Sequence, residues 1–204
     1  MSSLARNSLF VALCCLLACG GGTTSGTGSA ERAQTSVGPT STNPNVTVQT
    51  TQVYYDIFGN SITQLRQELS NKGPGAYFGR VDSTISYDYK AGGSCVVASA
   101  RARVDSQLTL PRWDMPANAA PSLVAEWNRF IAALERHELN HVEIDVTQAE
   151  IFWATVFELP AFPDCAALDN AIAELHQRAL QRAGTLNQEY DQRTQHGVTE
   201  GATL

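Results

Sequence analysis

"RHELNHVEID", residues 136–145, is the stretch of the chain on which its fold depends. The apolar residues before it recur at three- and four-residue steps, and they are Leu123, Trp127, Phe130, Ile131 and Leu134. This spacing is typical of one face of an amphipathic helix. The pattern predicts a single long helix over residues 122–157, with Ser122 as its cap. Pro160 and Pro163 follow this segment and end the helix.

Two of the four histidines of the chain lie in this stretch, four residues apart. His137, Glu138 and His141 continue the apolar stripe, so both imidazoles lie on the face that turns toward the interior. Residues i and i+4 of a helix have Cβ atoms about 5 to 6 Å apart, which lets two ring nitrogens share one metal ion. Glu138, rotated by about 100°, is suited to take a proton from a water at the metal. This is the H-E-x-x-H pattern of zinc peptidases.

A catalytic zinc site needs a third protein ligand, and the sequence offers several. Asp145 lies on the same face as His137, but about 12 Å further along an unbroken helix. We therefore expect Asp145 to be a second-shell carboxylate that fixes His141. Glu174 and His176 lie on a second predicted helix, where His176 falls one step off the apolar stripe and is expected to be solvated.

The remaining candidate lies in "YDQRTQHG", residues 190–197, which follows the predicted second helix. We interpret this run as a tail folded back across the first long helix, with His196 as a zinc ligand and Gly197 permitting the turn. Tyr190 would donate a hydrogen bond to the developing oxyanion, and Asp191 would be a second-shell carboxylate. The alternative is a frayed C-terminus.

The metal itself is predicted to be Zn²⁺. Imidazole ligands, a carboxylate base and an exported protein all suit a redox-inert Lewis acid. The alternative is that His137 and His141 are ordinary core residues without a metal, which would leave buried ring nitrogens in need of partners.

Strands are predicted in the first half of the domain. Residues 46–58 are rich in β-branched and aromatic side chains, and residues 81–89 alternate along a second strand. A turn at residues 91–94 leads into a long alternating strand over residues 96–110, which has its even-numbered side chains buried. These segments predict a small antiparallel sheet.

Two further helices complete the expected fold. Ser61 and Gln64 have the spacing of a capping box and open a short helix that ends near Gly73. A second long helix carries one apolar face, weakly interrupted at Gly184, and the residues of this face are Leu168, Ile172, Leu175, Ala179 and Leu186. Sheet and helices follow one another in the chain, which is the order of an α+β fold.

The N-terminus resembles a bacterial lipoprotein signal. Arg6 precedes an apolar run over residues 9–18, which is too short to span a bilayer. Leu16, Leu17, Ala18 and Cys19 then form a lipobox, so residues 1–18 are predicted to be removed and Cys19 to carry the lipid. The protein is therefore expected in the cell envelope, held to a membrane by its acyl chains.

Composition places one folded domain after a tether. Residues 19–45 are rich in Gly, Ser, Thr and Pro and predict a flexible tether, and residues 46–204 form the domain. The hydrophobic fraction of 43% and the charged fraction of 17% suit a globular core. A net charge of −6 gives no electrostatic basis for a nucleic-acid partner.

Cysteine usage supports export. Of five cysteines, Cys14 and Cys15 lie in the predicted signal and Cys19 at the lipid site, which leaves Cys95 and Cys165. An even remainder in an oxidising compartment predicts a disulfide worth about 4 kcal/mol. The alternative is two separate buried thiols.

These features together resemble a known bacterial family. The lipobox, the tether, the paired strands before "RHELNHVEID", the cysteines on either side and the closing "YDQRTQHG" look like domain of unknown function 922, over residues 46–201. That family is described as predicted secreted zinc-dependent proteases. The resemblance implies a zincin-like metallopeptidase fold and activity.

The sequence thus predicts a lipid-anchored zinc peptidase acting on a peptide or protein substrate. Zinc would be held by His137, His141 and His196, and Glu138 would act as general base and then acid. Two alternatives stay open at this point. One is a non-catalytic envelope lipoprotein with a structural zinc site, and the other is a zinc-dependent cell-wall amidase.

Overall fold

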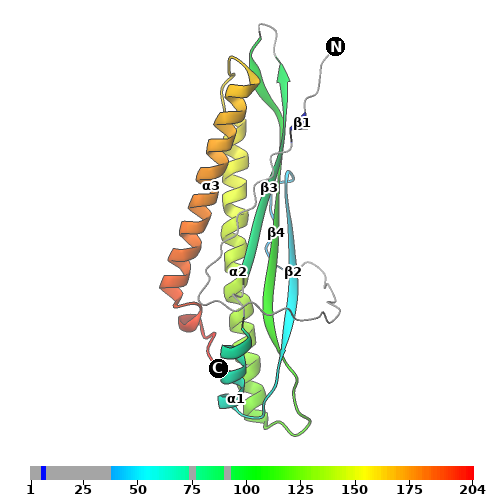
Figure 1. The fold of residues 1–204 in the computed structure, drawn as a ribbon, viewed down its shortest axis with the longest axis vertical. Coiled ribbons are helices and arrows are strands. Elements are labelled where there is room, and N and C mark those ends of the chain that lie inside the picture. The colour runs from blue at the N-terminus through cyan, green and yellow to red at the C-terminus, as the bar shows by residue number, and fades with distance from the viewer. Residues whose placement is uncertain (1–5, 8–37, 74–76, 90–92) are drawn as a thin grey trace.

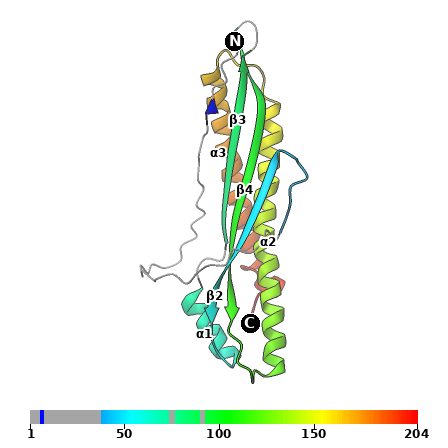
Figure 2. The ribbon, with the colours of Figure 1, turned by 90° about the vertical axis from the view of Figure 1, so that its right-hand side faces the viewer.

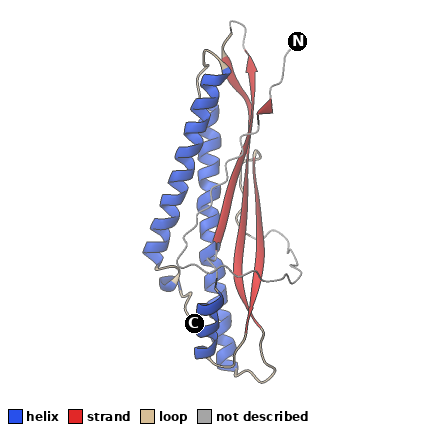
Figure 3. Cartoon of the chain, viewed as in Figure 1, coloured by secondary structure: helices blue, strands red, loops and turns tan. Residues whose placement is uncertain are grey.

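The computed structural model describes residues 6–7, 38–73, 77–89 and 93–204. The molecule is elongated, with a sheet on one side and the two long helices on the other (Figure 1, Figure 3). The elements in chain order are β1 (Arg6–Asn7), β2 (Val46–Ile57), α1 (Ile62–Lys72), β3 (Tyr77–Tyr89), β4 (Cys95–Trp113), α2 (Pro121–Phe157), α3 (Cys165–Thr194) and the 3₁₀ helix η1 (Val198–Glu200). The predicted α+β class is confirmed.

The sheet is mixed, with the order β1-β3-β4-β2. β1 is antiparallel to β3, and β3 and β4 form the antiparallel pair that the sequence predicts. β2, however, runs parallel to β4 from Val46 opposite Ala102 to Ile57 opposite Trp113. The expectation of a purely antiparallel sheet is therefore wrong. Alternation in a sequence indicates which side chains are buried, and it carries no information about the direction of the neighbouring strand.

β4 changes phase along its length. Its even-numbered residues from Ala100 to Leu110 are buried, as predicted. Nearer its start the register with β3 shifts between Ser86 and Tyr87, and Cys95 is buried while Ala98 is exposed. A bulge of this kind exchanges the two faces of a strand, so the even-numbered rule fails before Ser99.

The long helices cover one face of this sheet (Figure 2). The central core between α2 and the sheet contains Val46, Ala102, Val104, Leu108, Leu110, Val142, Val146, Ala149 and Leu180. α2 has the predicted length, but its cap is Ala120 followed by Pro121, and Ser122 is not the cap. Proline at the first helical position lacks only an N–H that would have no partner in the helix.

α3 is longer than predicted. Asp164 caps it by accepting a hydrogen bond from the Ala167 N–H, and the helix passes through Gly184 without a break. It ends where Gln195 takes the left-handed conformation. The sequence predicts that Tyr190 begins a tail after the helix. This is wrong, because residues 190–194 form the last turns of α3.

The end of the molecule where α2 stops and α3 starts is held covalently. The predicted disulfide between Cys95 and Cys165 is present, with the two Cα atoms 5.1 Å apart. The apolar residues buried around it are Ala100, Phe152, Val156, Leu168 and Ile172. His176, one turn after Ile172, is only 2% exposed and lies beside Phe152. The expectation of a solvated His176 is wrong.

The opposite end of α2 packs against α1. Ser61 caps α1 by accepting from the Gln64 N–H, while the Gln64 side chain accepts from Asn60. Leu65 of α1 is fully buried, and Leu204, which is 8% exposed, belongs to the same apolar cluster. The other members of this cluster are Ile57, Trp113, Leu123, Trp127 and Phe130.

Apart from Arg6 and Asn7, the predicted signal lies outside the described residues, as do Cys19, most of the tether and residues 91–92 of the predicted turn. The last part of the tether, residues 38–45, lies along α2. There Gly38 packs against Leu139, and the Thr42 N–H donates to Glu150 at 3.2 Å. Within the described residues, no helix has both the length and the apolar character needed to cross a membrane.

Candidate metal centre

The predicted inward face of α2 is confirmed. His137, Glu138, His141 and Asp145 are between 2% and 6% exposed. They are buried because they continue the apolar stripe of α2, and α3 covers them. Four polar side chains thus occupy positions that would ordinarily hold core residues.

α3 supplies the carboxylate that meets the two imidazoles. Oδ1 of Asp191 lies 3.2 Å from Nε2 of His137 and 3.2 Å from Nε2 of His141. The ligand atoms of these three residues lie within 4.8 Å of one another, and the group could hold a metal ion. Asp191, which the sequence analysis expects to orient a ligand, is therefore the third member of the group that could hold a metal ion.

The other candidates for the third ligand lie elsewhere. The side chain of His196 is 78% exposed, and its Nδ1 is 3.5 Å from Oδ1 of Asp191 without joining the group of close ligand atoms. The predicted ligation by His196 is thus corrected. Because α3 continues to Thr194, Asp191 still faces α2 while the turn carries His196 outward. Glu174 also points to solvent, with a side chain that is 73% exposed.

A relay from α3 orients His141. Oδ1 of Asn187 lies 2.8 Å from Nδ1 of His141, and the Asn187 amide nitrogen donates to Asp145 at 3.0 Å. The sequence predicts that Asp145 orients His141. In the structure Asp145 does so indirectly, through the side-chain amide of Asn187. The carboxylate can only accept, so it turns the Asn187 oxygen toward the imidazole.

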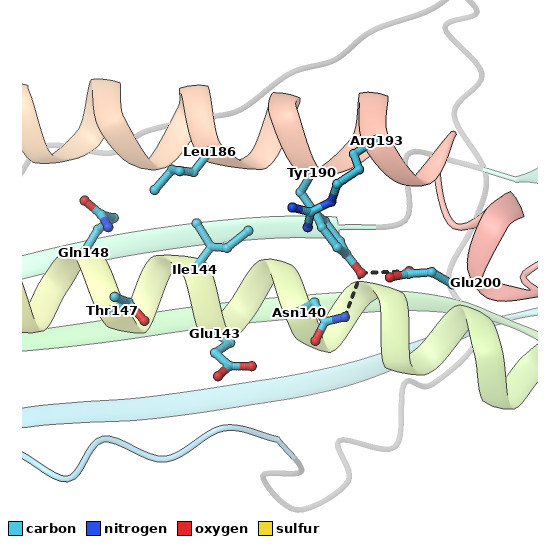
Figure 4. Close-up of a pocket in the computed structure, with 9 residues that line it drawn as sticks. All are labelled: Asn140, Glu143, Ile144, Thr147, Gln148, Leu186, Tyr190, Arg193 and Glu200. Atoms are coloured by element: carbon cyan, nitrogen blue, oxygen red, sulfur yellow. Dashed lines mark hydrogen bonds between the residues drawn. The ribbon is translucent and has the colours of Figure 1, made fainter.

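A second set of hydrogen bonds orients His137. Its Nδ1 lies 2.9 Å from Oε2 of Glu200. The Tyr190 hydroxyl donates to the same oxygen at 2.8 Å and accepts from the Asn140 amide at 2.7 Å (Figure 4). The Tyr190 ring stacks on His137 with centroids 4.8 Å apart. This hydroxyl therefore lies on the Nδ1 side of His137, which supports a positioning role for Tyr190 rather than the predicted oxyanion contact.

These partners decide where the protons of the imidazoles lie. Nδ1 of His137 faces the carboxylate of Glu200, and Nδ1 of His141 faces the amide oxygen of Asn187. Each Nδ1 therefore carries the proton, and each Nε2 of a neutral ring presents a lone pair. Both lone pairs point at one oxygen of Asp191. Three acceptors that converge in this way require a cation or additional protons between them.

Electrostatics distinguish the two glutamates of the site. Burial raises the pKa of Glu138 to about 8, and the negative charge of Asp191 adds to this effect. Partial burial acts in the same direction on Glu200, but hydrogen bonds from His137 and Tyr190 outweigh it and hold the pKa of Glu200 below its usual value. Without a cation beside it, Glu138 thus holds its proton at neutral pH, whereas the carboxyl group of Glu200 is ionised.

The turn after α3 explains the glycine that follows His196. Gly197 has a φ of 82°, and a Cβ there would lie 3.1 Å from Cγ of His137. Only glycine combines this backbone conformation with such a close approach. The predicted role of Gly197 in the turn is confirmed.

Sequence reasoning missed three residues of the site: Asn140, Asn187 and Glu200. Asn187 carries a usable signal, because it lies four residues before Asp191 and so shares a face of α3. Asn140, within the H-E-x-x-H stretch, faces Tyr190 rather than the imidazoles. Glu200 offers no local signal, because it reaches His137 only where the chain after α3 folds back along α2.

The fold and site define a class: an α+β protein in which a helix-borne His-Glu-x-x-His sequence meets a carboxylate from a second long helix. The comparison with protein families is more particular. The family described as "Bacterial protein of unknown function (DUF922)" matches residues 52–197, and the chain belongs to this family. The predicted resemblance to domain of unknown function 922 is confirmed for residues 52–197. No curated protein and no solved structure matches the chain.

Proposed function

We propose that the protein is a zincin-like, zinc-dependent peptidase. The observation that carries the proposal is the convergence of two Nε2 lone pairs and one carboxylate oxygen, beside the buried carboxyl group of Glu138. Imidazole nitrogen and carboxylate oxygen are the ligands of the common catalytic zinc sites. The arrangement has the same donor set, two histidines and one acid.

The two distances from Asp191 to the imidazoles suit a tetrahedral ion, and the three ligand atoms as a group lie within 4.8 Å. Zinc binds nitrogen and oxygen ligands at about 2.0 to 2.1 Å, so two ligands of a tetrahedron lie about 3.3 Å apart. Oδ1 of Asp191 is 3.2 Å from the Nε2 atom of each histidine. Among the residues that the structure describes, three side chains supply close ligand atoms. Three protein ligands favour a catalytic site over a structural one, which is closed by four.

The residues divide the work of hydrolysis between them. His137, His141 and Asp191 would hold the metal, and bound zinc supplies a Lewis acid that polarises the scissile carbonyl and acidifies a water. Glu138 accepts the proton of the attacking water and passes it to the leaving amine. A bound cation would lower the raised pKa of Glu138 toward neutral pH, where a carboxyl group can take and return a proton.

We extend the proposal to location. A signal over residues 1–18 and a lipid on Cys19 would hold the domain at a membrane of the cell envelope. The disulfide between Cys95 and Cys165 supports this, because such bonds persist in oxidising compartments.

The test compares Glu138→Gln with the parent protein and with Glu174→Gln, which makes the same change on an exposed residue of α3. Zinc content is measured on each protein, together with hydrolysis of a fluorescently labelled unfolded protein. We expect all three to bind one zinc ion, and Glu138→Gln to lose activity by a factor of about 10² or more. Equal turnover by Glu138→Gln and the parent would overturn the mechanism.

A further inference from the structure

The ten residues after α3 form a strap, residues 195–204, that returns along α2. Arginines of α2 hold it by its backbone rather than by its side chains. Arg136 donates to the carbonyl oxygen of Glu200 at 3.2 Å, and Arg129 donates to those of Gly201 and Thr203 at 2.8 Å each. Hydrogen bonds from charged donors are the stronger kind, so they fix the path of the strap.

The far end of the strap is anchored in the core near α1. Leu204 is 8% exposed and belongs to the apolar cluster that includes Leu65 and Trp127. The Arg66 side chain also donates to the backbone oxygen of Leu204. The strap therefore joins the end of α3 to α2 and to α1.

The strap delivers one functional group, the carboxylate of Glu200. Its Oε2 accepts from both His137 and Tyr190, and the arginine contacts leave the carboxylate to those two partners. The side chain is 28% exposed and lines a cavity of about 370 Å³ between α2 and α3 (Figure 4). Water in this cavity can compete for the Glu200 carboxylate, so the contact with His137 depends on the strap being held in place.

From these contacts we infer that Glu200 is a positioning residue for His137, and that docking of the C-terminal strap sets the metal affinity of the centre. The inference rests on the proposed zinc function. A carboxylate on Nδ1 fixes the tautomer and the ring orientation, and it makes Nε2 a better ligand. Glu200 lies beyond the segment that matches the family, residues 52–197, so the structure rather than the family assigns it.

The first experiment replaces the carboxylate. Glu200→Ala removes the acceptor, and Glu200→Gln keeps the shape without the charge. Zinc affinity is measured by competition with a chromophoric chelator, with Glu174→Gln as the matched control. We expect Glu200→Ala to weaken zinc binding by roughly 10- to 100-fold, Glu200→Gln to weaken it less, and the control to equal the parent.

A second readout needs no metal. The tautomer of His137 is read from ¹⁵N chemical shifts of metal-free protein, at a pH where the ring is neutral. The parent should carry its proton on Nδ1, and Glu200→Ala should give a mixture of tautomers. A role of Glu200 in folding alone would change the stability of the metal-free protein and leave the tautomer as it is.

The third variant loosens the strap without touching the centre. Arg129→Gln removes the charged donor to Gly201 and Thr203, and Arg178→Gln is its control on an exposed part of α3. We expect Arg129→Gln to weaken zinc binding less than Glu200→Ala does, and to shift the tautomer in the same direction.

The inference is overturned if Glu200→Ala binds zinc within twofold of the parent, or if its His137 keeps the parent's tautomer. If Arg129→Gln matches the parent in both measurements, the part that concerns strap docking is wrong. Should the parent bind no zinc, the proposed function fails, while the tautomer measurements still decide the positioning role of Glu200.

Discussion

The two ends of α3 are held to the rest of the molecule in opposite ways. At the disulfide end, the bond that joins Cys165 of α3 to Cys95 of β4 is surrounded by buried apolar residues such as Phe152 and Val156. At the histidine end, the contact is made by His137, His141, Asp191 and the residues that orient them. The comparison teaches that one helix can combine a permanent covalent link at one end with a conditional contact at the other.

The histidine end is conditional because acidic groups gather there. Glu138, Asp145 and Asp191 lie around the two imidazoles, and buried like charges repel unless a proton or a cation separates them. Apolar packing at the disulfide end does not depend on solutes in this way. The following predictions test whether the two ends differ as this argument requires.

Breaking the covalent clamp should have the largest effect. Replacing Cys95 and Cys165 by serine opens a loop with a sequence separation of 70 residues. We expect a loss of about 4 kcal/mol in the free energy of unfolding, measured by denaturant titration. Zinc affinity at the other end should stay within a few-fold of the parent in the folded variant. A large loss of zinc affinity would show that the two ends are not separate.

The histidine end should respond to pH when no metal is bound. The pKa of Glu138 is about 8 in the folded protein, above its ordinary value of 4.5, so the folded state holds the proton more tightly. This contribution is fully present below pH 4.5 and is lost as the pH rises toward 8. We expect the metal-free protein to lose on the order of 3 kcal/mol over this window. Glu138→Gln should flatten the dependence, and an unchanged slope in that variant would contradict the assignment.

Zinc should strengthen the histidine end alone. At a free zinc concentration 100 times the dissociation constant, the parent should gain about 2.7 kcal/mol in the free energy of unfolding. Asp191→Asn, which keeps the size of the side chain, should gain much less at the same concentration. Thermal unfolding with and without zinc measures both. Equal gains in the two proteins would remove Asp191 from the ligand set.

The smallest effect is expected at His196. Its side chain is exposed and stands outside the group of close ligand atoms. His196→Ala should therefore retain zinc with an affinity within about twofold of the parent, as expected for a surface substitution of no more than about 0.5 kcal/mol. Chelator competition measures this. A tenfold loss of zinc affinity would show that His196 is a ligand after all.

The residues that sequence analysis placed correctly are those whose burial follows a regular period. His137, Glu138 and His141 continue an apolar stripe, so the 3.6-residue period of α2 locates them and fixes the side they face. The pairing of Cys95 with Cys165 follows from the number of cysteines that remain after the predicted signal and lipid site are set aside. In each case the information is local to one element or to the composition of the chain.

The errors arose where polar residues take core positions or where tertiary contacts decide. Asp191 lies on the last turns of α3, which read as a loop because their inward face meets a polar site and breaks the apolar pattern. His176 likewise breaks the apolar pattern, so the sequence predicts that it is solvated, although it is buried beside Phe152. The parallel pairing of β2 and the contact of Glu200 with His137 join distant segments, and no local period encodes them.

The position of the disulfide divides the metal centre into two topological parts. Cys95 and Cys165 close a ring of chain that contains all of α2, and both imidazoles lie inside it. Asp191 and Glu200 lie on the free arm beyond Cys165. The two imidazoles therefore belong to a covalently closed circle of chain, whereas the carboxylates that meet them come from outside it.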